Sequence, residues 1–139
     1  MIGADTNLLV RFIVRDDDEQ AGLFDQLLTQ CEADGHPIHI NQIVLVELVW
    51  VLQSAYAMAK PEIVSILDRM IFARQFDVEE GQLVWQAVQL YQSSSAGFAD
   101  CLIAVKNTAA GCRATFTFDR VASRLPGMCT LDGSSPLAG

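Results

Sequence analysis

Apolar residues recur every three or four positions along most of this chain, which is the spacing of one face of an α-helix. The first such stretch follows Thr6, the expected N-cap, and a later one follows Asn41, which we expect to cap the next. Pro61 opens another helix, and Gly111 ends the last long one. The pattern predicts helices over about residues 6–15, 16–31, 42–57, 61–72, 82–92 and 98–110, and a short one over 119–125.

Short β-branched and aromatic stretches lie between these helices. The predicted strands are MIGAD ending at Asp5, HPIHI, a brief extended piece around FDV, CRATFTF and MCTL. Strands that alternate with helices predict an α/β fold whose parallel sheet is covered on both faces. Residues 1–139 are expected to form a single domain, with SSSAG as an internal linker and SSPLAG as a tail.

Four carboxylates stand out from this pattern. Asp5 and Asp119 each follow a predicted strand, and ligands of such sheets bind at the carboxyl ends of the strands. Glu47 is the single charge in the apolar run IVLVELVWVL, and Asp100 lies in the apolar helix FADCLIAV. Taken singly, each has a plainer interpretation, as a helix cap, a first-turn acid or the partner of an arginine. Four acids at one edge repel unless a cation neutralises them, and oxygen ligands suit Mg²⁺ or Mn²⁺.

The overall composition changes this picture only slightly. The net charge of −8 argues against a broad basic surface for nucleic acid, and it fits either a cation site or a solubilising surface. The four cysteines form no C-x-x-C pair and are interpreted as small buried apolar residues in a reducing compartment. No signal peptide and no membrane-spanning run is predicted, so we expect a cytoplasmic location.

The ordered set of motifs resembles the PIN-domain ribonucleases, and within them the VapC-type toxins of bacterial toxin–antitoxin modules. The matching residues are the opening D-T-N at Asp5, the acid Glu47 in its apolar helix, F-A-D-C-L-I-A around Asp100, and T-F-D ending at Asp119. The resemblance covers nearly the whole chain. It implies a three-layer α/β/α fold with a central parallel sheet of about four to five strands, and a Mg²⁺- or Mn²⁺-dependent endoribonuclease. It also implies an RNA substrate, a homodimer and inhibition by a cognate antitoxin.

The resemblance also suggests roles for individual residues. It implies that Asp5, Glu47, Asp100 and Asp119 are the catalytic, metal-binding acids. Asn7 resembles the polar residue that orients this cluster, and Thr117 the hydroxyl residue that accompanies the last acid, whereas capping suffices to explain Thr6. Arg120, beside Asp119, is the expected phosphate contact, and the other basic residues that could flank the site are Arg11, Arg15, Lys106 and Arg124.

Two other interpretations remain open at this point. A haloacid-dehalogenase-like aspartyl-phosphate enzyme also begins with strand–Asp, but it needs a second Asp where this chain has Asn7. A binding module with the same fold and little nuclease activity is the alternative from another class. The remaining conspicuous side chains receive structural interpretations: His36 and His39 at a strand, and Trp50 and Trp85 in the core or an interface.

Overall fold

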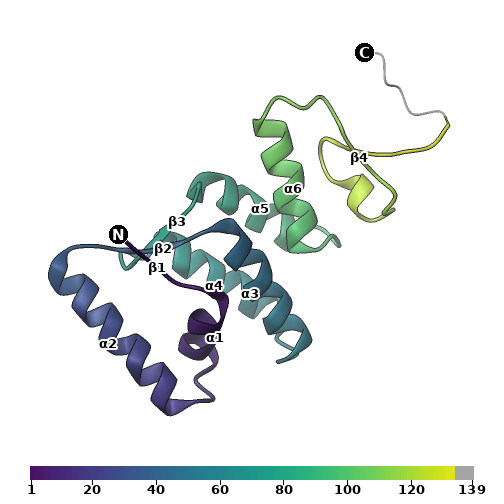
Figure 1. Cartoon of the computed structure of the whole chain (residues 1–139). Coiled ribbons are helices and arrows are strands. Elements are labelled where there is room, and N and C mark those ends of the chain that lie inside the picture. Colours follow the sequence, from purple (N-terminus) through teal and green to yellow (C-terminus); the bar gives the residue numbers. More distant parts are fainter. Residues whose placement is uncertain (134–139) are drawn as a thin grey trace. The chain divides into compact units, whose positions relative to one another are not determined.

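The computed structural model describes residues 1–133 and shows an α/β fold, as predicted (Figure 1). Helices alternate with short strands along the described part of the chain. The elements are β1 (Ile2–Gly3), α1 (Thr6–Val14), α2 (Asp18–Asp34), β2 (Ile38–Ile40), α3 (Gln42–Ser54), α4 (Lys60–Phe72), β3 (Phe76–Val78), α5 (Gly81–Ser93), α6 (Phe98–Ala109), β4 (Thr115–Thr117), the 3₁₀ helix η1 (Ala122–Arg124) and β5 (Met128–Thr130).

All strand pairings in the described residues are parallel, as the alternation predicts. β2 lies between β1 and β3 in a three-stranded sheet, and β4 pairs with β5 in a two-stranded sheet. Helices connect β1 to β2 and β2 to β3, since parallel neighbours require a crossover. The expected four to five strands are therefore present, but they divide between two sheets.

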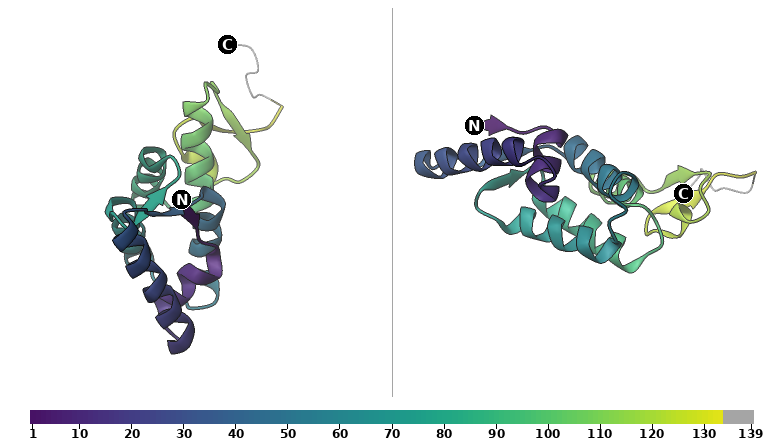
Figure 2. Two further views of the ribbon diagram at one scale, coloured as in Figure 1. Left: turned by 60° about the vertical axis from the view of Figure 1, so that its left-hand side comes forward. Right: turned by 90° about the horizontal axis from the view of Figure 1, so that it is seen from below.

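The chain divides into two compact units, Met1–Gly81 and Gln82–Gly139. In the first unit, α1 packs against α2 and α3 (Figure 2). The ring of Phe12 on α1 lies 5.1 Å from that of Phe24 on α2 and 6.1 Å from that of Phe76 on β3. In the second unit, the rings of Tyr91 and Phe98 pack edge to face, with centroids 5.9 Å apart. The prediction of a single domain over residues 1–139 stays a prediction.

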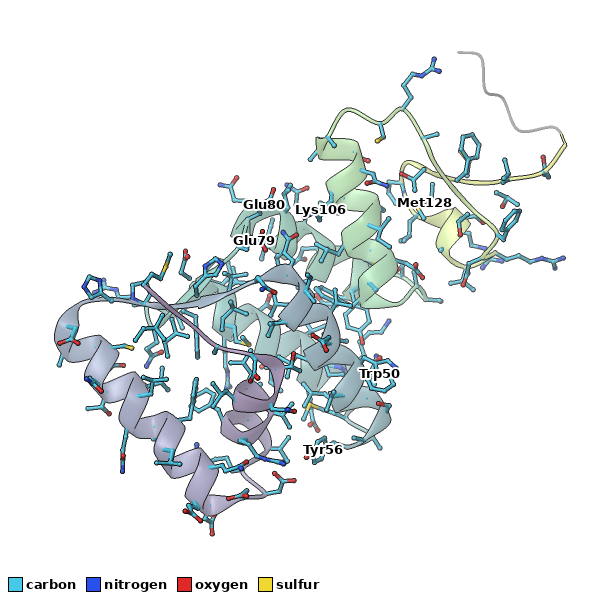
Figure 3. All side chains as sticks on the ribbon, in the orientation of Figure 1. Trp50, Tyr56, Glu79, Glu80, Lys106 and Met128 are labelled. Atoms are coloured by element: carbon cyan, nitrogen blue, oxygen red, sulfur yellow. The ribbon has the colours of Figure 1, made fainter. Side chains whose placement is uncertain are left out.

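The second unit joins β5 tightly to α6. Gly127, just before β5, has a φ of +80°, and a Cβ at this position would lie 2.9 Å from Oγ1 of Thr108 on α6. Its carbonyl accepts the Thr115 backbone N–H at 2.8 Å. Met128, the next residue, is buried (Figure 3). Because residue 127 has a positive φ and no room for a Cβ, glycine is the residue that fits there.

The helix boundaries follow their capping residues, with one correction. Asp5, not Thr6, caps α1, because its side chain accepts the Leu8 backbone N–H. Asn41 caps α3 as predicted, and its Oδ1 accepts the Val44 N–H at 2.9 Å. Thr6 is the first residue of α1, so its hydroxyl is available for another contact.

Other predicted elements differ in length. α3 ends at Ser54 rather than about residue 57, and β4 is shorter than the predicted strand CRATFTF. The segment after Asp119 is a single 3₁₀ turn rather than an α-helix. The predicted tail, residues 134–139, lies outside the described residues. Within residues 1–133, no helix is both long and apolar enough to cross a membrane.

Candidate functional site

Asp5 lies at the junction between β1 and α1, and its side chain is exposed. One carboxylate oxygen, Oδ1, accepts the Leu8 backbone N–H at 3.1 Å, so the structural role expected of a strand-following acid is real. The other oxygen, Oδ2, has no hydrogen-bond partner among the described residues. Capping fixes the carboxylate and leaves this oxygen for a ligand.

Glu47 is exposed, although nine of the ten residues in its run are apolar. The Thr6 hydroxyl donates a hydrogen bond to Oε1 of Glu47 at 3.3 Å, and this contact joins the start of α1 to the middle of α3. Thr6, for which the sequence suggested only a capping role, therefore orients Glu47, a candidate metal ligand. Ile43 and Trp50 lie four residues before and three residues after Glu47, on the same face of α3, and are 71% and 68% exposed. Trp50 is labelled in Figure 3. This face of α3 is open rather than covered by the core.

A shallow pocket of about 320 Å³ opens beside Asp5. Asn7 and Arg11 are among its lining residues, so the polar residue after the first acid does face this surface. Arg11, however, is bound to Asp16 at 3.0 Å and donates to Gln20 at 2.7 Å. The carboxylate of Asp16 raises the pKa of Arg11, and this arginine serves an internal contact.

Asp16 and Arg15, at the C-terminal end of α1, also have hydrogen-bond partners. The Tyr56 hydroxyl donates to Oδ2 of Asp16 at 2.8 Å, and this hydrogen bond, with the Arg11 charge, lowers the pKa of Asp16. Arg15 binds both oxygens of Asp25 and lowers the pKa of that carboxyl. Arg11 and Arg15, which the sequence offers as residues flanking a phosphate, form ion pairs within the protein instead.

Asp100 lies in the first turn of α6, where the positive end of the helix dipole favours a carboxylate. Its side chain is half-buried and makes no hydrogen bond among the described residues. Lys106 lies further along the same helix, in its last turn. Both oxygens of Asp100 remain available to a cation.

Asp119 organises a tight turn after β4. Its Oδ1 accepts two backbone N–H groups, from Val121 at 2.8 Å and Ala122 at 2.9 Å. Its own N–H donates to Oγ1 of Thr117 at 3.0 Å, and the role that the resemblance implies for Thr117 stays a prediction. Arg120 follows and is exposed. As at Asp5, Oδ1 accepts the hydrogen bonds, and Oδ2 has no hydrogen-bond partner among the described residues.

The four acids are divided equally between the two compact units. Asp5 and Glu47 belong to the unit Met1–Gly81 and are linked through Thr6, whereas Asp100 and Asp119 belong to the unit Gln82–Gly139. Within residues 1–133, no three Asp, Glu, His or Cys side chains gather as metal ligands. The donor set nevertheless fits a hard divalent cation, because all four groups are carboxylates and each keeps at least one unused oxygen.

Two polar contacts near the first sheet were not predicted. His39 on β2 binds Asp77 on β3, with Nδ1 and Oδ2 2.8 Å apart. Glu79 follows β3, and its carboxylate accepts the backbone N–H of Gln42 at 3.0 Å. These partners are separated from each other by 38 and 37 residues, and no local pattern signals such pairs.

The expected burial of the cysteines and tryptophans is partly wrong. Cys31 and Cys101 are buried, but Cys112 is exposed and Cys129 only half-buried. Trp50 and Trp85 are exposed on α3 and α5, so neither belongs to the core. Their assignment to an interface stays a prediction.

The chain is similar to known proteins over most of its length. The family model described as PIN domain matches residues 3–128. A protein named VapC ribonuclease from Aquifex aeolicus (strain VF5) is 25% identical over 116 residues, which cover 84% of this chain and 85% of the relative. No solved structure matches the chain.

Proposed function

Because this chain belongs to the PIN domain family, we propose that it is a Mg²⁺- or Mn²⁺-dependent endoribonuclease acting as the toxin of a type II toxin–antitoxin system. The single observation that carries the proposal is the family match over residues 3–128, which spans all four candidate acids. The similarity to a protein named VapC ribonuclease over 84% of the chain supports the RNA substrate and the toxin role.

The residues that would hold the cation are Asp5, Glu47, Asp100 and Asp119. When bound, a divalent cation lowers the pKa of a coordinated water and stabilises charge on the scissile phosphate. Thr6 orients Glu47 through its hydroxyl, and Thr117 holds the turn that aims Asp119. The cap made by Asp5 and the turn closed by Asp119 fix these two carboxylates before any ligand binds, which lowers the cost of organising the site.

We expect D5N and D100N to lose Mg²⁺-dependent cleavage of total cellular RNA, because each change removes a charged metal ligand. Asparagine caps helices as well as aspartate does, so D5N should fold like the parent. The measurement is RNA cleavage with Mg²⁺, with Mn²⁺ and with a chelator, followed by mapping of the cut ends. The resemblance predicts 5′-phosphate and 3′-hydroxyl ends.

The matched control is D34N, which removes an exposed carboxylate at the end of α2 and should cleave as the parent does. Titration of the metal into parent, D5N and D100N by calorimetry decides between the proposal and a binding module. A nuclease should bind Mg²⁺ or Mn²⁺ through these carboxylates, and a module without activity should not. Folded D5N and D100N that cleave at the parent rate would show that the acids are wrongly assigned.

The proposed partners are the RNA substrate, a cognate antitoxin and a second copy of this chain, in the cytoplasm. The exposed apolar residues Ile43 and Trp50 share one face of α3 and support a protein contact, since an apolar surface gains free energy when another surface covers it. Sedimentation of the purified chain tests the dimer, and the double variant I43S/W50S should shift it toward the monomer.

A further inference from the structure

The charges of this chain are distributed very unevenly. Residues 1–81 contain 14 acidic and 5 basic residues, whereas residues 82–139 contain 3 acidic and 4 basic residues. Two of the three acids in the second group, Asp100 and Asp119, are candidate metal ligands. The whole negative excess therefore lies in the first unit, and the second offers a phosphate chain a less repulsive surface.

Phe118 is the most exposed large apolar side chain among the described residues, at 81%. It lies between Thr117 and Asp119, in the bend after β4, the strand labelled in Figure 1. The hydrogen bond from the Asp119 N–H to Thr117 and the two that Asp119 accepts fix the backbone on both sides of it. A rigid turn thus presents an aromatic ring to solvent.

Exposed cations follow this ring closely. Arg120 and Arg124 are exposed and form no ion pair among the described residues, in contrast to Arg11 and Arg15. The Ser123 hydroxyl donates to the Arg120 carbonyl at 2.7 Å, which adds a further constraint to this turn. An exposed aromatic ring followed within a few residues by exposed arginines is a combination that suits single-stranded nucleic acid, where the ring stacks on a base and the cations contact phosphates.

We infer that Phe118, Arg120 and Arg124 form a subsite for one unpaired nucleotide of the RNA, with the base stacked on the Phe118 ring. The inference rests on the proposed function and deepens it, because it requires the nucleotide that contacts the turn beside Asp119 to be unpaired. A base inside a duplex is already stacked on its neighbours and cannot reach the ring. A contact with a protein would use Phe118 too, but it would not need the arginines.

The test measures RNA binding by the full chain in the D100N background, so that cleavage does not interfere. A labelled single-stranded oligoribonucleotide and the same strand in a duplex are titrated by fluorescence anisotropy. F118A should weaken binding of the single strand by roughly tenfold, F118W should bind within about threefold of the parent, and duplex binding should not change. In a W50F/W85F chain, the fluorescence of F118W should be quenched by the single strand.

The matched control is F72A, which removes a 71% exposed phenylalanine at the end of α4 and should bind RNA like the parent. Single-strand binding that is unchanged in F118A, or weakened equally for single strand and duplex, would overturn the inference, as would absence of binding in the D100N parent. RNA cleavage by the unmodified chain is measured separately. Cleavage together with unchanged F118A binding therefore defeats only the inference, and absence of cleavage defeats the proposed function.

Discussion

At the scale of single residues, Asp16 joins three segments of the N-terminal unit. Its Oδ1 accepts a hydrogen bond from Arg11 on α1, and its Oδ2 accepts one from the hydroxyl of Tyr56, in the segment after α3. The three aspartates Asp16 to Asp18 look alike in sequence, where all of them favour a helix start. Only Asp17 acts as the cap of α2, and Asp16 faces a different set of partners.

We predict that Y56F raises the pKa of Asp16 toward its ordinary value, because the tyrosine hydroxyl is the largest cause of the lowered pKa. A lowered pKa in the folded state stabilises the protein above the unfolded-state pKa, and this contribution disappears as the pH falls through the folded-state value. Y56F should therefore reduce the unfolding free energy at neutral pH and not in strong acid. NMR titration of the carboxyl carbons measures the shift.

Asp25 is the internal control for that titration. Its pKa is lowered by Arg15 and not by Tyr56, so it should titrate identically in Y56F and in the parent. An unchanged Asp16 titration would mean that the hydroxyl does not stabilise its charge.

At the scale of elements, the turn after β4 combines a structural and a chemical role in one side chain. Asp119 closes the turn by accepting two backbone N–H groups and still has a free oxygen for a cation. The sequence assigned it both as a helix-opening residue and as a ligand, and the geometry makes these two roles compatible. Asp5 combines the same two roles at the start of α1.

We predict that D119A lowers the unfolding free energy by about 1 kcal/mol, since it removes the acceptor of both N–H groups. D119N should unfold like the parent, because the amide oxygen accepts the same hydrogen bonds, yet it should bind Mg²⁺ more weakly. Denaturant unfolding and calorimetry of both variants separate the two roles. Equal stability of D119A and D119N would show that the cap contributes nothing.

At the scale of the whole molecule, the net charge of −8 hides two opposite balances. The total charge argues against RNA binding, and this was the main objection that composition raised against a nuclease. The excess acid lies in residues 1–81, whereas Arg120 directly follows the candidate metal ligand Asp119 and Arg124 ends η1. Substrate binding depends on this local balance rather than on the total.

We predict that R120Q/R124Q weakens RNA binding and lowers the salt dependence of the affinity by about 1.4 in the logarithmic slope, which corresponds to two lost phosphate contacts. The double variant R69Q/R74Q changes the net charge equally in the first unit and should keep the parent slope. Binding titrations between low and physiological salt supply both numbers. An equal effect of the two double variants would mean that only the total charge matters.

Much of the fold could be predicted because its signals are local. Helical spacing, the Asn41 cap, Pro61 and Gly111 each act within one turn of the chain, and the structure confirms the elements that they mark. The errors were local competitions, such as Asp5 against Thr6 as the cap of α1, where two adjacent residues offer the same chemistry. The order of the four acids along the chain was also sufficient to indicate the family, which the match over residues 3–128 confirms.

The amino-acid pattern alone was enough to predict most helices and strands, the parallel strand pairing and the candidate carboxylates. Four features came to light only in the folded chain: Glu47 is exposed and held by Thr6, His39 binds Asp77, Arg11 and Arg15 are already paired, and Phe118 faces solvent. The physical reason is that periodicity records which residues are apolar and how the local backbone folds. It does not record which distant segment covers a given side chain, and this choice sets the charge, exposure and partners from which a site is built.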